Sequence, residues 1–283
     1  MAETAESALD RTRGARRWAR YGVLTVVAIL ILFPIYVTVI FALKPGYAIF
    51  SYPRALLPVD LTLDTLHDAW TQGHFSRYLV NSAIVSLAIT FGAIATSLLA
   101  AYAFSFMRFP LKSVLFYLVL ATLLVPAEVT VLANSDTIKT LGWTDSYQGL
   151  VVPFLATAFG VFLLRQVFLT VPKDLREAAA LDGVGHFGFL REVAMPLARP
   201  TLGALALFSF LGAWSQYLWP QRITNDPDYR TVQIGLRSLS SANPDRLNLI
   251  TAGTVIAAVP IVIMLIIFQR QLIRGLTAGA VKG

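Results

Sequence analysis

Few polar side chains in this chain of 283 residues could carry chemistry. The three histidines are His67, His74 and His186, all in loop-forming segments. His67 and His74 are seven residues apart and could share a helix face, but a zinc site needs at least a third protein ligand, and none is near them. We therefore interpret both as solvated loop residues and predict no metal site.

The residue types needed for other active sites are also missing. The chain contains no cysteine, which excludes a disulfide, a thiolate nucleophile and a cysteine-based metal site. It has no Gly-x-x-x-x-Gly-Lys-Ser/Thr loop for nucleotide phosphates. No acid–base pair or nucleophile stands out, so we predict a protein that is not an enzyme and holds no cofactor of its own. A membrane-embedded enzyme is thereby disfavoured.

Glu128 is almost the only ionisable residue inside the apolar segments, and it lies near the end of one of them. Ionisable groups within a membrane usually mark transport pathways. A secondary carrier coupled to protons or sodium would normally need more buried carboxylates. The sequence therefore favours a transporter that is energised by another subunit, with a secondary carrier as the alternative.

Uncharged polar and aromatic residues at the end of the fifth apolar segment are candidates for a substrate path. They are Trp214, Ser215, Gln216, Tyr217 and Trp219. The aromatic rings could form an interfacial belt or a surface on which a polyol stacks, and both interpretations stay open. Asn81, and with it Asn134, could line the path or form hydrogen bonds between helices.

The elements that must position these residues are membrane helices. The chain is 56% hydrophobic and only 14% charged, whereas soluble domains carry about 25% charged residues. Apolar segments long enough for a hydrocarbon core of ~30 Å predict an all-α polytopic protein with six transmembrane helices. We place them at residues 21–43, 78–106, 113–133, 146–164, 201–219 and 247–268.

The distribution of basic residues predicts the orientation of these helices. Fifteen of the 23 Lys and Arg residues fall in segments that share one side with the N-terminus. The positive-inside rule places both termini in the cytoplasm. The net charge of +7 is thus explained by topology and membrane lipid, without a nucleic-acid partner. Residues 1–20 are expected to form an irregular, basic N-terminus.

The most polar helix-forming segment is residues 172–200. Asp174 is predicted as a helix N-cap, with Glu177 completing a capping box. Gly183 is predicted to stop this short helix, and Pro196 and Pro200 precede the next apolar segment.

This segment resembles the loop by which permeases of ABC importers dock on their ATPase subunits. The matching residues are Glu177, Ala178, Ala179, Asp182, Gly183 and Pro196, all at the family's spacing. Val184, Gly185 and His186 depart from it. Residues 216–220 and 230–236 are similar to the second permease subunit of glycerol-3-phosphate importers, which usually has Asn at the position of Ser215. The C-terminal tail is similar to that of second permease subunits of carbohydrate importers, the maltose system included, and the resemblance implies ATPase contacts for Gly275, Thr277, Gly279 and Lys282.

The resemblance implies a permease subunit in a bacterial inner membrane. Expected partners are a sister permease, two ATPase subunits that hold ATP and Mg, and an extracytoplasmic substrate-binding protein. The implied domains are a cytoplasmic N-terminus (1–20), a six-span permease domain (21–273) containing the coupling loop (172–200), and a cytoplasmic tail (274–283). The implied substrate is glycerol-3-phosphate or a glycerophosphodiester, with an oligosaccharide of the maltose or trehalose type as the alternative.

Overall fold

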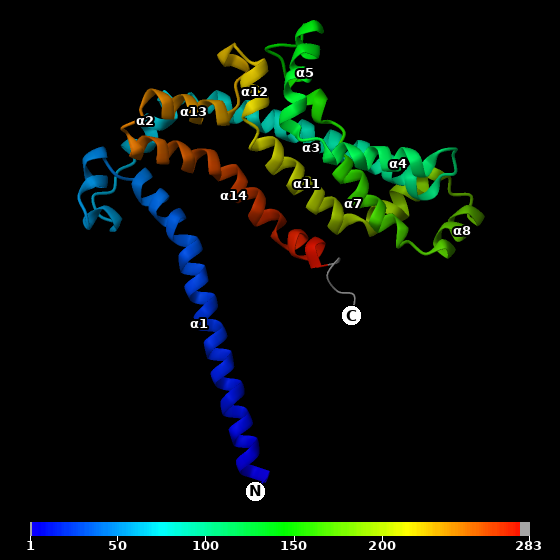
Figure 1. Ribbon diagram of the computed structural model, residues 1–283, viewed down its shortest axis with the longest axis horizontal. Helices are drawn as coiled ribbons and strands as arrows, with labels where there is room; N and C mark the ends of the chain where they lie inside the picture. Colours follow the sequence, from blue (N-terminus) through cyan, green and yellow to red (C-terminus); the bar gives the residue numbers. More distant parts are fainter. Residues whose placement is uncertain (1, 278–283) are drawn as a thin grey trace. The chain divides into compact units, whose positions relative to one another are not determined.

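The described part of the chain is helical, as predicted. The computed structural model (Figure 1) describes residues 2–277 and, within them, the side chains of residues 17–126 and 128–269. No strand occurs in this part of the chain. The α-helices are α1 (Ala2–Ala42), α2 (Asp64–Gln72), α3 (Phe75–Phe106), α4 (Lys112–Ala121), α5 (Ala127–Thr140), α6 (Tyr147–Val151), α7 (Ala158–Leu169), α8 (Lys173–Leu181), α9 (His186–Phe189), α10 (Met195–Leu197), α11 (Arg199–Trp214), α12 (Leu218–Ile223), α13 (Val232–Ala242) and α14 (Leu247–Thr277). Short helices of other types are η1 (Gly46–Phe50), η2 (Arg54–Leu56), η3 (Thr122–Leu124), η4 (Val152–Phe154), the π-helical η5 (Leu190–Ala194) and η6 (Pro227–Tyr229).

The long apolar helices agree with the prediction of a polytopic membrane protein. Three described helices are long and apolar enough to cross a bilayer by themselves, namely Arg17–Ala42, Phe75–Phe106 and Leu247–Gln269. Three more candidates are pairs of helices bent at a short break, which brings the number to six if each pair is one span. The fold class is therefore confirmed.

The third, fourth and fifth predicted spans correspond to these bent pairs rather than to single helices. The bends are 103° between Lys112–Leu124 and Glu128–Thr140, 43° between Tyr147–Phe154 and Ala158–Leu169, and 81° between His186–Leu197 and Arg199–Trp214. A proline lies at or near each break: Pro126, Pro153 and Pro200. Proline removes a helical hydrogen bond and disfavours the helical conformation of the residue before it.

The fifth span also ends earlier than predicted. α11 stops at Trp214, and α12 starts at Leu218 after three residues of irregular backbone. Pro220 explains the separation, because its ring would clash with the carbonyl of Gln216 in a continuous helix. Ser215, Gln216 and Tyr217 therefore lie in a linker rather than on a helix face.

The expectation of an irregular N-terminus is wrong. α1 begins at Ala2 and runs without interruption into the first apolar segment. Ala2, Ala5 and Ala8 are strong helix formers, and a helix already nucleated by a long apolar segment extends at little cost.

Residues 2–72 and 239–256 form one compact unit. Its core holds Lys44, which is fully buried and donates from Nζ to the carbonyl of Arg54 at 2.6 Å. The Lys44 carbonyl accepts from Thr65 Oγ1 at 2.9 Å and from Asn248 Nδ2 at 3.2 Å. These bonds order a segment that contains α2.

Residues 73–238 and 257–277 belong to the second unit. Its centre is α3, which packs against both α7 and α11 (Figure 1). Close approach is possible because small residues face one another: a Cβ at Gly160 would collide with the hydroxyl of Ser97, which lies on α3. Thr96 Oγ1 also donates to the Leu155 carbonyl at 2.6 Å. This packing sets the positions of both candidate sites described below.

Candidate functional site

The predicted coupling helix is present as α8. None of its residues is buried, and Leu181 at its end is 88% exposed. Glu177, Ala178 and Asp182 are all exposed. A helix that leaves polar and apolar side chains uncovered has a surface available to a partner.

The start of α8 differs from the prediction. The N-cap is Pro172, and no side chain caps the helix, whereas Asp174 lies inside the first turn. The capping box of Asp174 and Glu177 is therefore wrong. Extended backbone at Pro172 starts the helix two residues earlier than expected, and Asp174 instead favours the helix through its charge near the N-terminus.

The end of α8 is the predicted glycine stop. Gly183 adopts a left-handed φ of 75°. Its N–H donates to the Ala180 carbonyl at 3.1 Å, and the N–H of Val184 donates to the Ala179 carbonyl at 2.8 Å. These two bonds form a Schellman motif, which satisfies the last carbonyls of the helix.

The segment after Gly183 ties α8 to the core of the second unit. Tyr102 Oη on α3 lies 2.9 Å from His186 Nδ1. Ala179 and Val184 pack against a buried cluster that includes Phe106, Phe168 and Phe189. The residues that depart from the family pattern thus form an ordered attachment. Pro196 lies in α10, directly after the π-helical turn η5.

The predicted tail contacts remain predictions. Gly275 and Thr277 lie in the last turns of α14. Gly279 and Lys282 lie outside the described residues.

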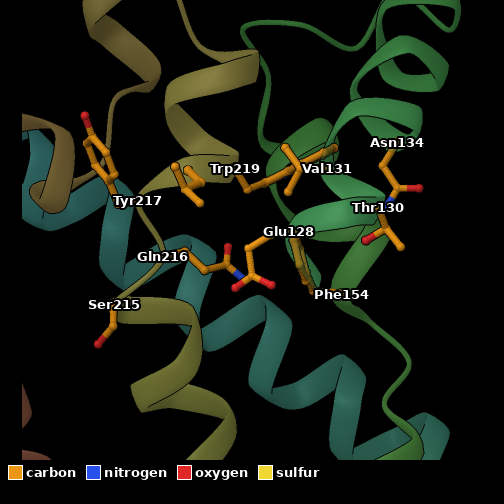
Figure 2. Close-up of a pocket in the computed structure, with 10 residues that line it drawn as sticks. Glu128, Thr130, Val131, Asn134, Phe154, Ser215, Gln216, Tyr217 and Trp219 are labelled. Carbon is orange, nitrogen blue, oxygen red and sulfur yellow. The ribbon is translucent and has the colours of Figure 1, made fainter. Parts of the chain in front are cut away.

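A second candidate site is a cavity of about 340 Å³ between α5 and the α11–α12 linker (Figure 2). Of the predicted substrate-path residues, Ser215, Gln216, Tyr217 and Trp219 line it. The other lining residues are Glu128, Thr130, Val131, Asn134, Phe154 and Leu218. The structure thus brings the polar end of the fifth span against the start of α5.

Glu128 and Gln216 extend toward each other in this cavity (Figure 2). Glu128 lies in the first turn of α5, where the helix dipole favours a negative charge. None of the salt bridges between described residues involves Glu128. Gln216 Oε1 is buried and has no hydrogen-bond partner. Both groups are therefore available to a ligand.

Trp219 forms a rigid wall of the cavity. Its indole Nε1 donates to the carbonyl of Gly149 at 3.2 Å. Pro153 has no N–H to offer this carbonyl, so the indole replaces the missing helical bond. Phe154 packs edge-on against Trp219, with ring centroids 5.6 Å apart. Because the indole N–H is occupied, Trp219 can present only its apolar ring to a ligand.

A loop contact holds the two sides of the cavity together. Asp145 follows α5, and its Oδ1 accepts from the N–H groups of Asn225, in the loop after α12, and of Asp226 at 2.8 Å. The N–H of Asp145 donates to the Ile223 carbonyl at 3.0 Å. The spacing of α5 and α12 therefore depends on this aspartate.

Two predicted path residues do not line the cavity. Trp214 is 2% exposed, stacks on Phe210 and donates from Nε1 to the Ala257 carbonyl at 3.1 Å. Asn81 is fully buried, donates to the carbonyls of Asp228 and Arg230 at 2.8 Å, and accepts from Tyr147 Oη. Both side chains serve packing between helices and loops.

Some lining residues were missed by the sequence reasoning. Phe154 and Val131 are apolar residues in apolar segments, and no local pattern distinguishes them from lipid-facing residues. The useful signal was the pair Pro126 and Glu128, since a proline break beside a lone carboxylate marks an irregular polar point in a membrane segment.

Comparison with known proteins decides the family. Residues 7–277 match the family described as binding-protein-dependent transport system inner membrane component. The chain belongs to this family. It is thus an importer permease with several membrane-spanning helices, and its relatives are transport subunits rather than enzymes.

Several relatives of this permease carry the same name. It is 36% identical over 261 residues to the sn-glycerol-3-phosphate transport system permease protein UgpE of Yersinia pestis bv. Antiqua (strain Antiqua), covering 89% of this chain and 93% of that protein. It is 34% identical over 255 residues to UgpE of Escherichia coli (strain K12), covering 87% and 91%.

A solved structure shares the fold of this permease. A chain of a bacterial ABC transporter involved in the import of the acidic polysaccharide alginate superposes with a TM-score of 0.79 and 21% identity, covering 89% of this permease and 94% of that chain. The permease fold of ABC importers is thereby confirmed.

Proposed function

We propose that this permease is one of two membrane subunits of an ABC importer for glycerol-3-phosphate or a related glycerophosphodiester. The observation that carries the substrate class is identity of 34–37% to UgpE proteins over 87–89% of the chain. The partners are a sister permease, two ATPase subunits that bind ATP and Mg, and an extracytoplasmic substrate-binding protein.

The permease domain at residues 21–273 contains the coupling loop at 172–200, and both termini lie in the cytoplasm. Glu177, Ala178, Ala179, Asp182, Gly183 and Pro196 carry the contact to the ATPase. The exposed surface of α8 and its rigid Schellman stop support this assignment, because a short, firmly ended helix can transmit a rigid-body movement. The tail at 274–283 adds further ATPase contacts.

The cavity at the α11–α12 linker is the part of the substrate path that this subunit contributes. Its support is the convergence of Ser215, Gln216, Tyr217 and Trp219 on one hollow. Trp214 and Asn81 are assigned to the framework of the path rather than to its surface, because their polar atoms already have partners.

The experiment is reconstitution of the complete importer, with its binding protein, in proteoliposomes. We expect ATP-dependent uptake of radiolabelled sn-glycerol-3-phosphate or of glycerophosphocholine. If the importer takes up maltose or trehalose but neither of these two compounds, the proposed substrate class is contradicted and an oligosaccharide importer is indicated.

A further inference from the structure

The polar groups of the cavity at the α11–α12 linker do not suit a phosphate. None of the described residues that line it is Lys, Arg or His. Phosphate sites in proteins are normally built from such cations or from clustered N–H donors. Instead, the cavity contains the carboxylate of Glu128, which repels an anion at close range.

The same groups suit a ligand that donates hydrogen bonds. An ionised carboxylate only accepts. Gln216 Oε1 is an acceptor that is buried and without a partner, and buried polar atoms normally have one. Glu128 and Gln216 extend toward each other (Figure 2), and both line this one cavity.

Hydroxyl groups fit this cavity better than an ammonium group. Asn134, which lines the cavity from the same helix as Glu128, carries an amide that both donates and accepts. A hydroxyl uses both functions, whereas an ammonium group can only donate. The ring of Trp219, whose N–H is occupied, supplies an apolar surface for the carbon skeleton of a polyol.

We infer that this cavity recognises the hydroxyl end of the substrate, with Glu128 and Gln216 as acceptors, and that the phosphate is held elsewhere in the importer. This inference rests on the proposed function and specifies how one subunit takes part in it. Glu128 is then a specificity-determining residue that selects polyol hydroxyls and keeps the anionic end of the substrate away from α5.

The test combines removal of a hydroxyl from the substrate with removal of its acceptor from the protein. Uptake by the reconstituted importer is measured for sn-glycerol-3-phosphate, for 3-hydroxypropyl phosphate, which lacks the middle hydroxyl, and for 2-hydroxypropyl phosphate, which lacks the terminal one. Each is measured in the parental complex and in Glu128→Ala. For each complex, the uptake of glycerol-3-phosphate is divided by the uptake of each analogue to give an uptake ratio. The binding protein contributes the same discrimination in both complexes, so its contribution cancels when their uptake ratios are compared.

We expect the parental complex to prefer glycerol-3-phosphate over at least one analogue by about tenfold, the factor for one hydrogen bond to a charged group. In Glu128→Ala, this ratio should fall toward one. Glu128→Gln keeps the shape and one acceptor oxygen, so it should retain an intermediate ratio. It also serves as the test if the alanine variant does not assemble.

Asp136→Ala is the matched control. Asp136 lies on the same helix and is exposed, and its only ion pair is with Lys139 at 3.8 Å within the described structure. It does not line the cavity, so its ratios should equal the parental ones. If the uptake ratio falls as far in Asp136→Ala as in Glu128→Ala, the effect is a general one of charge, and the inference is overturned.

The possible failures are distinguishable. No uptake of any of the three phosphates by the parental complex overturns the proposed substrate class, and the inference with it. Normal parental uptake with the same ratios in both Glu128 variants overturns the inference alone. A gain in uptake of a quaternary ammonium compound that depends on Glu128 would show a cation site and also overturn it.

Discussion

At the scale of single residues, backbone conformation separates positions that look equivalent in the sequence. Gly183 and Gly185 are both exposed glycines in the loop after α8, and a Cβ on either would meet no atom within 4 Å. Only Gly183 has a positive φ, of 75°. A side chain at position 183 would therefore be strained by the backbone conformation, whereas both positions have room for a Cβ.

We expect Gly183→Ala to weaken the stop of α8 and Gly185→Ala to have no such effect. A left-handed conformation costs an ordinary residue about 1–2 kcal/mol. In the assembled importer, Gly183→Ala should lower both ATPase retention during purification and transport, whereas Gly185→Ala should match the parent. Gly183→Asn, which tolerates this conformation, should restore part of the loss. Equal behaviour of the two alanine variants would contradict the role of the Schellman motif.

Asp145 illustrates how one half-buried residue positions an entire site. Asp145→Ala removes the acceptor of two backbone N–H groups, whereas Asp145→Asn keeps an acceptor oxygen and tolerates the φ of 50° at this position. We expect a weaker apparent substrate affinity, by about fivefold, in the alanine variant and a smaller change in the asparagine variant. Initial uptake rates over a range of substrate concentrations measure this. A normal affinity in Asp145→Ala would show that the loop contact does not set the width of the cavity.

At the scale of helices, prolines decide where the apolar segments break, and the breaks create the sites. Pro153 frees the carbonyl of Gly149, and the indole of Trp219 binds it. Pro220 separates α12 from α11 and places Gln216 in a linker. The same residues that interrupt helical hydrogen bonds therefore build the walls of the cavity.

Gly149→Ala should disturb this arrangement. A Cβ at Gly149 would collide with the carbonyl oxygen of Trp143, which is backbone and cannot move aside as a side chain can. We expect a loss of about 1–3 kcal/mol of stability, seen as a lower midpoint of thermal unfolding in detergent. Gly212→Ala on α11, where a Cβ meets nothing within 4 Å, is the control and should leave the midpoint unchanged or higher. A midpoint for Gly149→Ala equal to the parental one would contradict this account of the packing.

At the scale of the whole molecule, the orientation in the membrane follows from charge asymmetry and stays a prediction. The chain lacks cysteine, so single cysteines can be introduced without background. Leu181 at the end of α8 and Tyr47 before α2 are 88% and 79% exposed. We expect Leu181→Cys to react only with reagents that enter the cytoplasm and Tyr47→Cys to react with a membrane-impermeant reagent in intact cells. Reaction of Leu181→Cys with the impermeant reagent would overturn the topology.

Local patterns in the sequence predicted much of this protein. Apolar length predicted the membrane helices, and helix-forming residues ended by Gly183 predicted α8, because both depend on residues close together in the chain. The spacing from Glu177 to Pro196 indicated the family for the same reason. The prolines were visible as well, but the size of each bend was not, since it depends on what packs beside the break.

Contacts between distant segments were decided only by the tertiary structure. Trp214 and Trp219 are the same residue type, five positions apart in one aromatic segment. Both are buried with the indole N–H bonded to a carbonyl, but only Trp219 lines the cavity. Asn81 was predicted as a path residue, but its side chain forms hydrogen bonds to the backbone of a loop about 150 residues away in the chain. Glu128 became part of a site only when the bend at Pro126 placed it opposite Gln216. The sequence determined which segments cross the membrane, because burial of apolar length is a local property. Which polar groups remain free for a ligand depends on all the partners that folding brings to them.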